Sequence, residues 1–174
     1  MKKIIRTINL YEYSELEAKA KTKALNHWNE HCGNLMWLQS YLNDQCGGLL
    51  REHGIVCTSN HPVCLYSLSH SQGDGLMFEG TFEWKKWSIT IKHSGHYEHK
   101  YCRDIQMVDT SKDAILFEDS KSFKAFVKIY ESICDTLEKL GYDYIESETS
   151  EAHFIDQCNA NKYLFTKDGT LDSE

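Results

Sequence analysis

Hydrophobic and polar side chains alternate most clearly in the middle of the chain. Residues 76–83 place a mostly apolar set of side chains on one side of an extended backbone and a mostly polar set on the other, and residues 87–91 do the same. This pattern predicts strands over 55–58, 63–69, 76–83, 86–93 and 97–108. Because their connections are short, we expect antiparallel hairpins rather than parallel strands joined by crossover helices.

Two helices are predicted before this β-region. Ser14 and Glu17 form a capping-box pattern that opens the first, apolar residues then recur at helical spacing, and Gly33 is the expected stop. The second is predicted over about 35–53, with Gly54 as the residue that follows its end. A glycine pair within it lowers its intrinsic helix propensity by roughly 1 kcal/mol per glycine relative to alanine.

Two further helices are predicted after the β-region. A long amphipathic stripe runs through about 120–140, and Gly141 is expected to stop that helix. The last helix is predicted at about 148–160, and short strands are predicted near the two ends of the chain, at 3–11 and 162–166. The fold class is therefore α+β, an antiparallel sheet of about four to six strands with two N-terminal and two C-terminal helices packed on it.

Length and composition predict one domain. The chain has 174 residues, of which 41% are hydrophobic and 12% aromatic, and this is enough apolar material for one core. A single proline and ten scattered glycines leave no segment with the composition of a linker. We expect one domain over 1–174, with a polar tail over 170–174 that frays.

The charge and the cysteines narrow the functional classes. A net charge of -7 argues against a protein that coats nucleic acid, because such a protein needs a basic surface. No apolar run approaches the roughly 18 residues of a membrane-spanning helix and no secretory signal is recognised, so we expect a cytoplasmic protein without a membrane partner. Seven cysteines without a CxxC pair predict free buried thiols rather than a structural zinc site.

A candidate site lies in the loop between two predicted strands, at Ser71, Gln72, Gly73, Asp74 and Gly75. Two glycines in five residues permit positive φ angles and a close approach between backbone and ligand. The loop is also richer in hydrogen-bonding side chains than a turn needs, and Glu79 lies nearby in the sequence. The alternative is a hairpin loop whose Gly-Asp-Gly serves only the geometry of the turn.

A second candidate site is the histidine-rich segment 93–99, whose role depends on its geometry. In a continuous strand, His93 and His99 share a face with Tyr97 but lie roughly 20 Å apart, which is too far to bind one metal. If a two-residue Ser-Gly turn follows His93, then His93 and His96 become cross-strand neighbours about 5 Å apart. Only then is a metal or a general base conceivable, with a carboxylate from the neighbouring strand. Exposed sheet histidines without a ligand are the third interpretation.

The tract from Tyr66 to Gly80, YSLSHSQGDGLMFEG, resembles a family of small phage and prophage proteins. Members carry the pattern aromatic-x-x-Ser-Gln-Gly-Asp-Gly followed by Phe-x-Gly. Where members tend to read Arg-Tyr-Tyr-His, this chain reads His-Tyr-Glu-His at 96–99, so a cation at position 96 requires a protonated histidine. The resemblance also covers residues 4–31, 91–99 and 159–169.

The resemblance implies a phage setting and, through a label often attached to the family, a link to toxin–antitoxin systems. We therefore predict a phage-encoded accessory protein that binds and neutralises a host factor in the host cytoplasm, as an anti-defence or anti-CRISPR protein. A small nucleotide-binding or hydrolytic enzyme that uses the Ser71–Gly75 loop and the 93–99 histidines is the alternative, and an antitoxin is a second alternative. No cofactor, metal or catalytic residue is assigned. The residues expected to bind a ligand or a partner protein, from host or phage, are Ser71, Gln72, Gly73, Asp74, Gly75, Glu79, His93, Tyr97 and His99.

Overall fold

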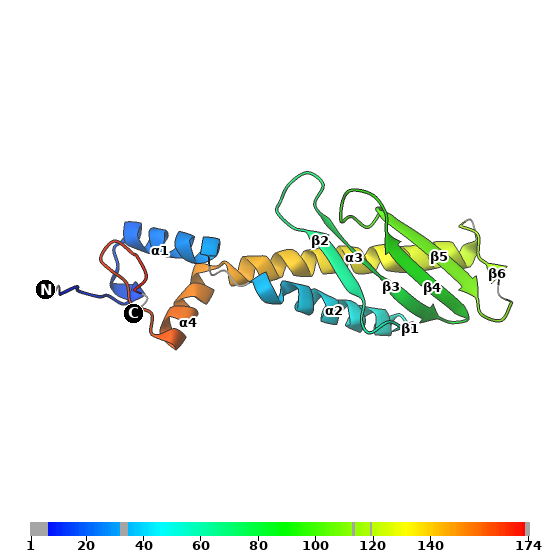
Figure 1. Ribbon diagram of the computed structural model, residues 1–174, viewed down its shortest axis with the longest axis horizontal. Helices are drawn as coiled ribbons and strands as arrows, with labels where there is room; N and C mark the ends of the chain where they lie inside the picture. The colour runs from blue at the N-terminus through cyan, green and yellow to red at the C-terminus, as the bar shows by residue number, and fades with distance from the viewer. Residues whose placement is uncertain (1–6, 32–34, 113, 119, 173–174) are drawn as a thin grey trace, which may run out of the picture. The chain divides into compact units, whose positions relative to one another are not determined.

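The computed structural model describes residues 7–31, 35–112, 114–118 and 120–172 of the chain. Within these residues the fold is α+β, as predicted: a six-stranded antiparallel sheet with two α-helices before it and two after it (Figure 1). The chain forms two compact units, a terminal unit of Met1–Leu35 with Ile145–Glu174, and a sheet unit of Met36–Tyr144. A single domain over 1–174 stays a prediction, because it depends on whether the two units unfold together.

The sheet unit is organised around its longest strand, β3. Its strands are β1 (Ile55–Cys57), β2 (Val63–Ser67), β3 (Gly75–Trp84), β4 (Trp87–His93), β5 (Arg103–Asp109) and β6 (Ala114–Ile115). β2 pairs with the first half of β3 and β1 with its second half, while β4 pairs with β3 from Gly80 to Trp84. β5 pairs with β4, and β6 with β5. All of these pairings are antiparallel, as the short connections predicted.

The largest error in the predicted strand bounds falls at the histidine-rich segment. The strand predicted over 97–108 begins instead at Arg103, whose partner across the ladder is His93. Ser94 donates its N–H to the carbonyl of Cys102 at 2.9 Å, and residues 94–102 form a loop beyond this bond. Alternation extended the strand too far because aromatic and charged side chains also alternate within this loop.

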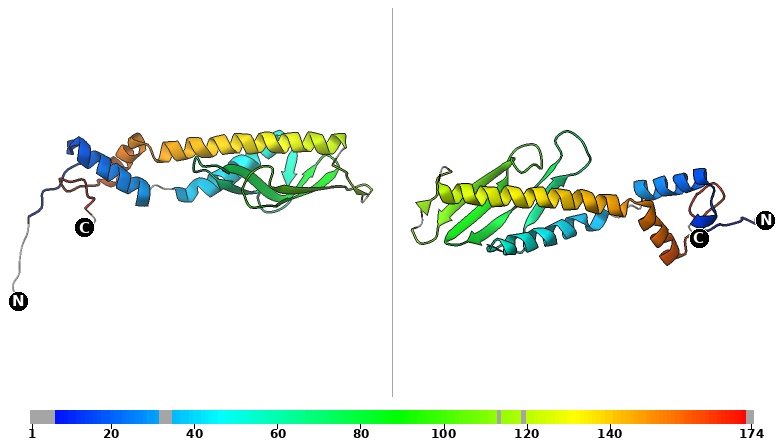
Figure 2. Two further views of the ribbon diagram at one scale, coloured as in Figure 1. Left: turned by 90° about the horizontal axis from the view of Figure 1, so that it is seen from above. Right: turned by 180° about the vertical axis from the view of Figure 1, so that it is seen from behind.

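Two helices lie along one face of the sheet (Figure 2). They are α2 (Leu38–Glu52), which follows the short 3-10 helix η2 (Leu35–Trp37), and α3 (Lys121–Glu148). The ring of Tyr130 in α3 lies 4.7 Å from that of Phe78, and the ring of Phe126 lies 5.7 Å from that of Trp84. Burying an aromatic side chain of this kind contributes about 1.5–3 kcal/mol, so these contacts hold α3 on the sheet. Across the described residues, no helix is both long enough and apolar enough to cross a membrane.

Gly141 does not end α3, contrary to the prediction from the sequence. The helix continues to Glu148 and buries this glycine. A Cβ at Gly141 would overlap the side chain of Leu68 and would lie 3.7 Å from that of Leu42. Gly141 is therefore a packing position, at which the missing side chain lets two leucines approach the helix, and it is not a helix C-cap.

The terminal unit contains the first and last helices of the prediction. They are the 3-10 helix η1 (Tyr13–Glu15), α1 (Ala18–His31) and α4 (Glu151–Asn161). The capping box joins Glu12 and Glu15 instead of Ser14 and Glu17, and it opens η1 rather than α1. The prediction was therefore wrong in the capping residue as well as in its position, because the chain makes one 3-10 turn, capped by a glutamate, before the α-helix begins.

The strands predicted near the two ends of the chain are reduced to isolated bridges. Tyr11 pairs with Phe165, and Phe165 pairs with Leu171. Asp172 also donates its backbone N–H to the carbonyl of Leu164 at 2.9 Å. Residues 170–172 are therefore hydrogen-bonded rather than frayed. The remaining positions named in these predictions lie outside the described residues, namely 3–6, Gly33 and 173–174.

Aromatic side chains dominate the core of the terminal unit. The ring of Phe154 lies 5.0 Å from that of Tyr13 and 5.3 Å from that of Trp28. The buried residues of this core are Tyr13, Leu16, Ala20, Ala24, Trp28, Phe154, Cys158 and Phe165. They come from η1 and the residue just after it, from α1, from α4 and from the segment after α4, so the two ends of the chain share one core.

The cysteines in the described part of the chain are free thiols, as predicted. Cys57 and Cys102 are partly exposed. The buried ones are Cys46, Cys64, Cys134 and Cys158.

Candidate functional site

Asp74 organises the loop between β2 and β3. One carboxylate oxygen, Oδ1, accepts the hydroxyls of Ser67, Ser69 and Ser71 at 3.0, 3.0 and 2.9 Å. The other, Oδ2, accepts the backbone N–H groups of Ser69 and Ser71 at 2.6 and 3.0 Å. Oδ2 also accepts the hydroxyl of Tyr142, at 2.8 Å, so α3 is bonded to the same carboxylate. This loop, residues 68–74, is therefore tied together through one side chain.

These hydrogen bonds set the charge state of Asp74. Desolvation raises the pKa of its carboxyl, but the N–H of Ser71, the hydroxyl of Tyr142 and the N–H of Ser69 outweigh it and hold that pKa well below its usual range. Among the described residues, no lysine, arginine or histidine forms an ion pair with this carboxylate. A carboxylate with a low pKa and occupied lone pairs is a weak general base, so Asp74 acts as a fixed point of the loop.

The second candidate segment lies against this loop, as expected from the pairing of neighbouring strands. A Cβ at Gly73 would lie 3.1 Å from two ring carbons of Tyr97, and a Cβ at Gly75 would lie 2.7 Å from the ring of His99. Gly73 also has a φ of +97°, which favours glycine. The two glycines therefore make room for Tyr97 and His99, and the two loops pack together as a pair.

Neither geometry considered for the histidines is present. The 94–102 loop is longer than a two-residue turn, and the strand does not continue through it. The ring Nε2 of His93 bonds to the carbonyl of Tyr97 at 3.1 Å, and the ring Nδ1 of His99 accepts the N–H of Tyr101 at 3.3 Å. Over the residues that the structure describes, no three His, Cys, Asp or Glu side chains are grouped to hold a metal. The histidines instead shape their own loop.

Ion pairs with α3 fix the end of the 94–102 loop. Lys100 donates to Asp135, and Arg103 donates to Glu131 at 2.7 Å. The hydrogen bond to Asp135 raises the pKa of Lys100 above its usual value. Arg103 also donates to the carbonyl of Lys100 and lies 5.6 Å from the ring centroid of Tyr101. Both loops are thus bonded to the same helix.

The nine candidate residues gather at one end of the sheet. Glu79 accepts the backbone N–H of His93 at 3.2 Å, which links them to the two loops. Ser71, Gln72 and Gly73 are exposed, whereas Gly75 is buried. The remaining candidates are Asp74, Glu79, His93 and His99, which are half-buried, and Tyr97, which is exposed.

Residues that complete this site were missed because they lie far away in the sequence. Tyr142 reaches Asp74 from a distance of 68 positions along the chain. Asp135 and Glu131 reach the 94–102 loop from α3. The helical stripe predicted α3, but which polar residues meet these loops depends on how the helix is rotated and placed on the sheet. No local pattern contains that information.

Comparisons with known proteins leave the geometry as the main guide to function. No protein-family model, no curated protein and no solved structure matches the chain. The resemblance to phage proteins therefore stays a prediction from the sequence.

Proposed function

We propose that this chain is a binding protein whose contact surface is the pair of loops 68–74 and 94–102. The observation that carries the proposal is the exposure of Tyr97 and Tyr101, at 58% and 64%, on the 94–102 loop, which is otherwise firmly bonded and packs against the 68–74 loop. Tyrosine and arginine are enriched at protein interfaces, because they offer large contact areas together with hydrogen-bonding groups. Arg103, which donates to Glu131 and to the carbonyl of Lys100, holds the base of the 94–102 loop beside Tyr101 and is not itself part of the exposed surface.

The two loops are held in shape before any partner binds. Asp74 ties the first loop to Tyr142, and the ion pairs of Lys100 and Arg103 tie the second loop to α3. Ordering side chains and loops on association costs free energy, at about 0.5–1.5 kcal/mol per immobilised side chain. A surface that is already ordered avoids part of this cost, which supports a binding role for the paired loops.

The partner that we propose is a host protein, which the chain would neutralise during phage takeover of the cell. The phage resemblance of the loop tract motivates this choice, and the net charge of -7 fits a protein partner better than nucleic acid. An antitoxin would bind its target through a surface of the same kind, so the identity of the partner separates the two roles.

A nucleotide-binding or hydrolytic function has less support. That function needs the loop glycines to offer backbone N–H groups to a phosphate and Asp74 to accept a proton. The space beside Gly73 and Gly75 is filled by Tyr97 and His99, and the oxygens of Asp74 already accept six hydrogen bonds. Thermal-shift measurements with nucleotides should therefore show no stabilisation, and a shift abolished by Asp74→Ala would favour the enzyme instead.

The test compares two variants of the whole chain in a host lysate and in infected cells. Tyr97→Ala combined with Tyr101→Ala removes the exposed aromatic surface, whereas Phe117→Ala removes an aromatic side chain that is 79% exposed and lies outside both loops. Loss of two central interface tyrosines should weaken capture of the partner at least about tenfold and abolish protection of the phage. The Phe117→Ala control should behave as wild type. Equal capture by the double variant, or no partner and no protection with the wild type, would contradict the proposal.

A further inference from the structure

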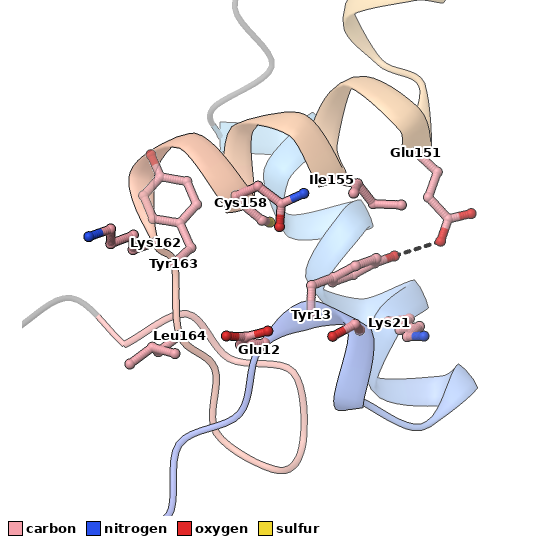
Figure 3. A pocket seen from close by; sticks show the side chains of 11 residues that line it. Glu12, Tyr13, Lys21, Glu151, Ile155, Cys158, Lys162, Tyr163 and Leu164 are labelled. Carbon is pink, nitrogen blue, oxygen red and sulfur yellow. Dashed lines mark hydrogen bonds between the residues drawn. The ribbon is translucent and has the colours of Figure 1, made fainter.

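The cavity of the terminal unit lies beside Tyr13, between the N-terminal turn, α1 and α4 (Figure 3). Its volume is about 550 Å³, and the hydroxyl of Tyr13 donates to Glu151 at 2.9 Å. Carboxylates and ammonium groups line it alike, namely Glu12, Glu151, Lys21 and Lys162. This lining favours neither sign of charge in a ligand. The sheet unit, by contrast, has a groove whose features select one kind of occupant.

That groove has a volume of about 510 Å³ and lies between α2 and β1. It follows the outer edge of the sheet, because β1 is the terminal strand of the strand order and pairs only with β3 among the described strands. The residues that line it are Asn43, Asp44, Gly47, Leu50 and Arg51 of α2, Ile55, Val56 and Cys57 of β1, and Asn60, His61 and Pro62 of the segment after β1.

α2 caps the neighbouring part of this edge, which belongs to β2. The Nε2 of Gln39 donates to the carbonyl of Cys64 at 2.8 Å, and the N–H of Cys64 donates to the Oδ1 of Asn43 at 2.9 Å. Gln39 and Asn43 lie four positions apart on one stripe of the helix, and the next position of that stripe is Gly47. Because glycine has no side chain, the cap does not continue along the groove to β1.

The edge of β1 is open as a result. Thr58 donates its N–H to the carbonyl of Thr81 in β3 at 2.8 Å, and backbone groups of alternate residues point to opposite sides of a strand. The N–H and C=O groups of Ile55 and Cys57 therefore point away from β3. Among the described residues, neither pair of groups has a hydrogen-bond partner. Such a row of free groups is a template for another strand.

Two opposite charges flank the glycine pair of α2 symmetrically. Asp44 and Arg51 both line the groove, and neither forms an ion pair with any residue that the structure describes. Their midpoint in the helix falls between Gly47 and Gly48. A Cβ at Gly47 or Gly48 would meet the guanidinium of Arg51, at 3.5 and 4.0 Å, and no described atom of another element within 4 Å. The glycines lower helix propensity without a packing contact inside the chain.

The glycine pair and Val56 lie at the same height along the groove. The middle of the pair is four to five residues before Glu52, the last residue of α2, which is roughly 7 Å at 1.5 Å per residue. Val56 is two residues after Gly54 in the turn that joins α2 to β1, which is also roughly 7 Å at 3.3 Å per residue. One two-fold axis can therefore pass beside both.

We propose that this edge binds a second copy of the chain, with β1 of the two copies paired antiparallel about a two-fold axis beside Val56. Ile55 of one copy then exchanges both backbone hydrogen bonds with Cys57 of the other, and the two Val56 side chains, each 58% exposed in the single chain, face one another.

The charges select a second copy over an unrelated strand. A two-fold axis reverses the direction of α2, so Asp44 of each copy lies opposite Arg51 of the other, and the glycine pairs let the two helices approach at the axis. Backbone groups, charges and glycines thus all match themselves after the same rotation. This surface shares no residue with the paired loops, so self-association is a property beyond the binding of a partner.

Self-association is measured by sedimentation equilibrium of the whole chain, in reductant, from about 5 to about 500 µM. The mass should rise with concentration from that of one chain, 20.2 kDa, to that of two. The mass of one chain at every concentration overturns the proposal.

A charge swap tests the arrangement of the two copies. Arg51→Glu and Asp44→Arg each place like charges opposite one another twice per dimer, so each should weaken self-association at least about threefold. The two changes combined restore opposite charges and should return the dissociation constant to within about twofold of wild type. Lys139→Glu makes the same change of charge as Arg51→Glu at an exposed position of α3, and it should have no effect. Unchanged self-association in both single variants, or no recovery in the combined variant, overturns the proposal.

A disulfide trap tests the pairing of β1. Directly opposed residues at a non-hydrogen-bonded position have Cα atoms about 4.5 Å apart, which a disulfide can span. Val56→Cys should therefore give a disulfide-linked dimer when oxidised glutathione accepts the two electrons of the thiols. Gln106→Cys, at an exposed position of β5, and the wild type should stay single chains on the same non-reducing gel. A linked dimer with Gln106→Cys but not with Val56→Cys, or none with Val56→Cys, overturns the proposal.

Discussion

The sheet unit and the terminal unit each contain a turn built around one aspartate, with different hydrogen-bond donors. In the sheet unit, Asp74 accepts neutral donors, namely serine groups and the hydroxyl of Tyr142. In the terminal unit, Asp168 accepts the ammonium of Lys23 at 2.5 Å and the hydroxyl of Thr166 at 2.6 Å. The side chains of Lys23 and Asp168 are 53% and 66% exposed, so water and salt reach this second turn freely.

Both arrangements lower the pKa of the carboxyl, but the physical causes differ. For Asp168 the hydrogen bond from Lys23 is the main cause. For Asp74, desolvation opposes ionisation, and the N–H of Ser71 and the hydroxyl of Tyr142 overcome it. An exposed ion pair is screened by salt, whereas short hydrogen bonds from fixed backbone groups are directional and much less screened. The Asp74 loop is therefore suited to present a surface of constant shape. The Asp168 turn instead joins α1 to the segment after α4 through an exposed ion pair.

The largest expected effect comes from Gly169 in the Asp168 turn. Its φ of +84° favours glycine, and a Cβ there would overlap the backbone carbonyl of Ala20. Because a backbone carbonyl cannot turn aside as a side chain does, Gly169→Ala should lower the free energy of unfolding by about 3 kcal/mol or more. Urea denaturation followed by tryptophan fluorescence measures this value. A loss below about 1 kcal/mol would show that the turn is not packed as described.

A smaller effect is expected at Gly73 in the Asp74 loop. Its φ of +97° is also unfavourable for alanine, but the nearest obstacle is the ring of Tyr97, at 3.1 Å, a side chain that can be displaced at lower cost than a backbone carbonyl. Gly73→Ala should therefore cost about 1–2 kcal/mol of unfolding free energy and should weaken partner capture by moving Tyr97. The same denaturation series measures both glycine variants. A larger loss for Gly73→Ala than for Gly169→Ala would reverse the comparison between the two turns.

Acid should weaken both turns. A carboxyl with a lower pKa in the folded chain than in the unfolded chain adds stability above its ordinary value of 3.8, and this stability is lost as the pH falls through the lowered pKa. The wild type should therefore lose stability below about pH 4, and Asp74→Asn should lose less over the same range. Thermal unfolding between about pH 5 and pH 2 tests this, with Asp104→Asn, at an exposed position of β5, as the matched control. Equal acid sensitivity in Asp74→Asn and wild type would contradict the role given to Asp74.

Salt gives the smallest expected effect and the sharpest contrast between the turns. Lys23→Gln should lower the melting temperature slightly at low ionic strength and not measurably at about 1 M NaCl, because the pair is exposed. Tyr142→Phe removes a neutral donor to Asp74 and should cost the same at both salt concentrations. Melting temperatures of the two variants and of the wild type, each measured at both salt concentrations, test this prediction. If salt abolished the effect of Tyr142→Phe, the distinction between the two turns would fail.

Much of the fold was predictable because it depends on local pattern. Alternation located β3 and β4 closely, and the apolar stripe located most of α3. The pattern misled where a residue had more than one possible use. Gly141 fits a helix stop as well as it fits a helix interior crowded by Leu68, and the sequence does not show which leucine will pack there.

The sequence predicted where the candidate site lies, but it did not predict which contacts build the site. The polar loop around Asp74 and its contact with the 93–99 segment followed from the order of the strands. That Tyr142 would bind an oxygen of Asp74 did not, because this bond needs the three-dimensional placement of α3. The cavity beside Tyr13 was not predicted either, since its residues come from both ends of the chain and share no motif.

The most direct test of the paired loops as a binding surface is site-specific photo-crosslinking in the host cell. One variant carries p-benzoylphenylalanine in place of Tyr97, and a second variant carries it in place of Phe117. Both side chains are exposed. Position 97 should give one discrete crosslinked protein that Tyr101→Ala reduces, and position 117 should give none. Crosslinking at 117 alone, or none at 97 while the protein still protects the phage, would contradict the account.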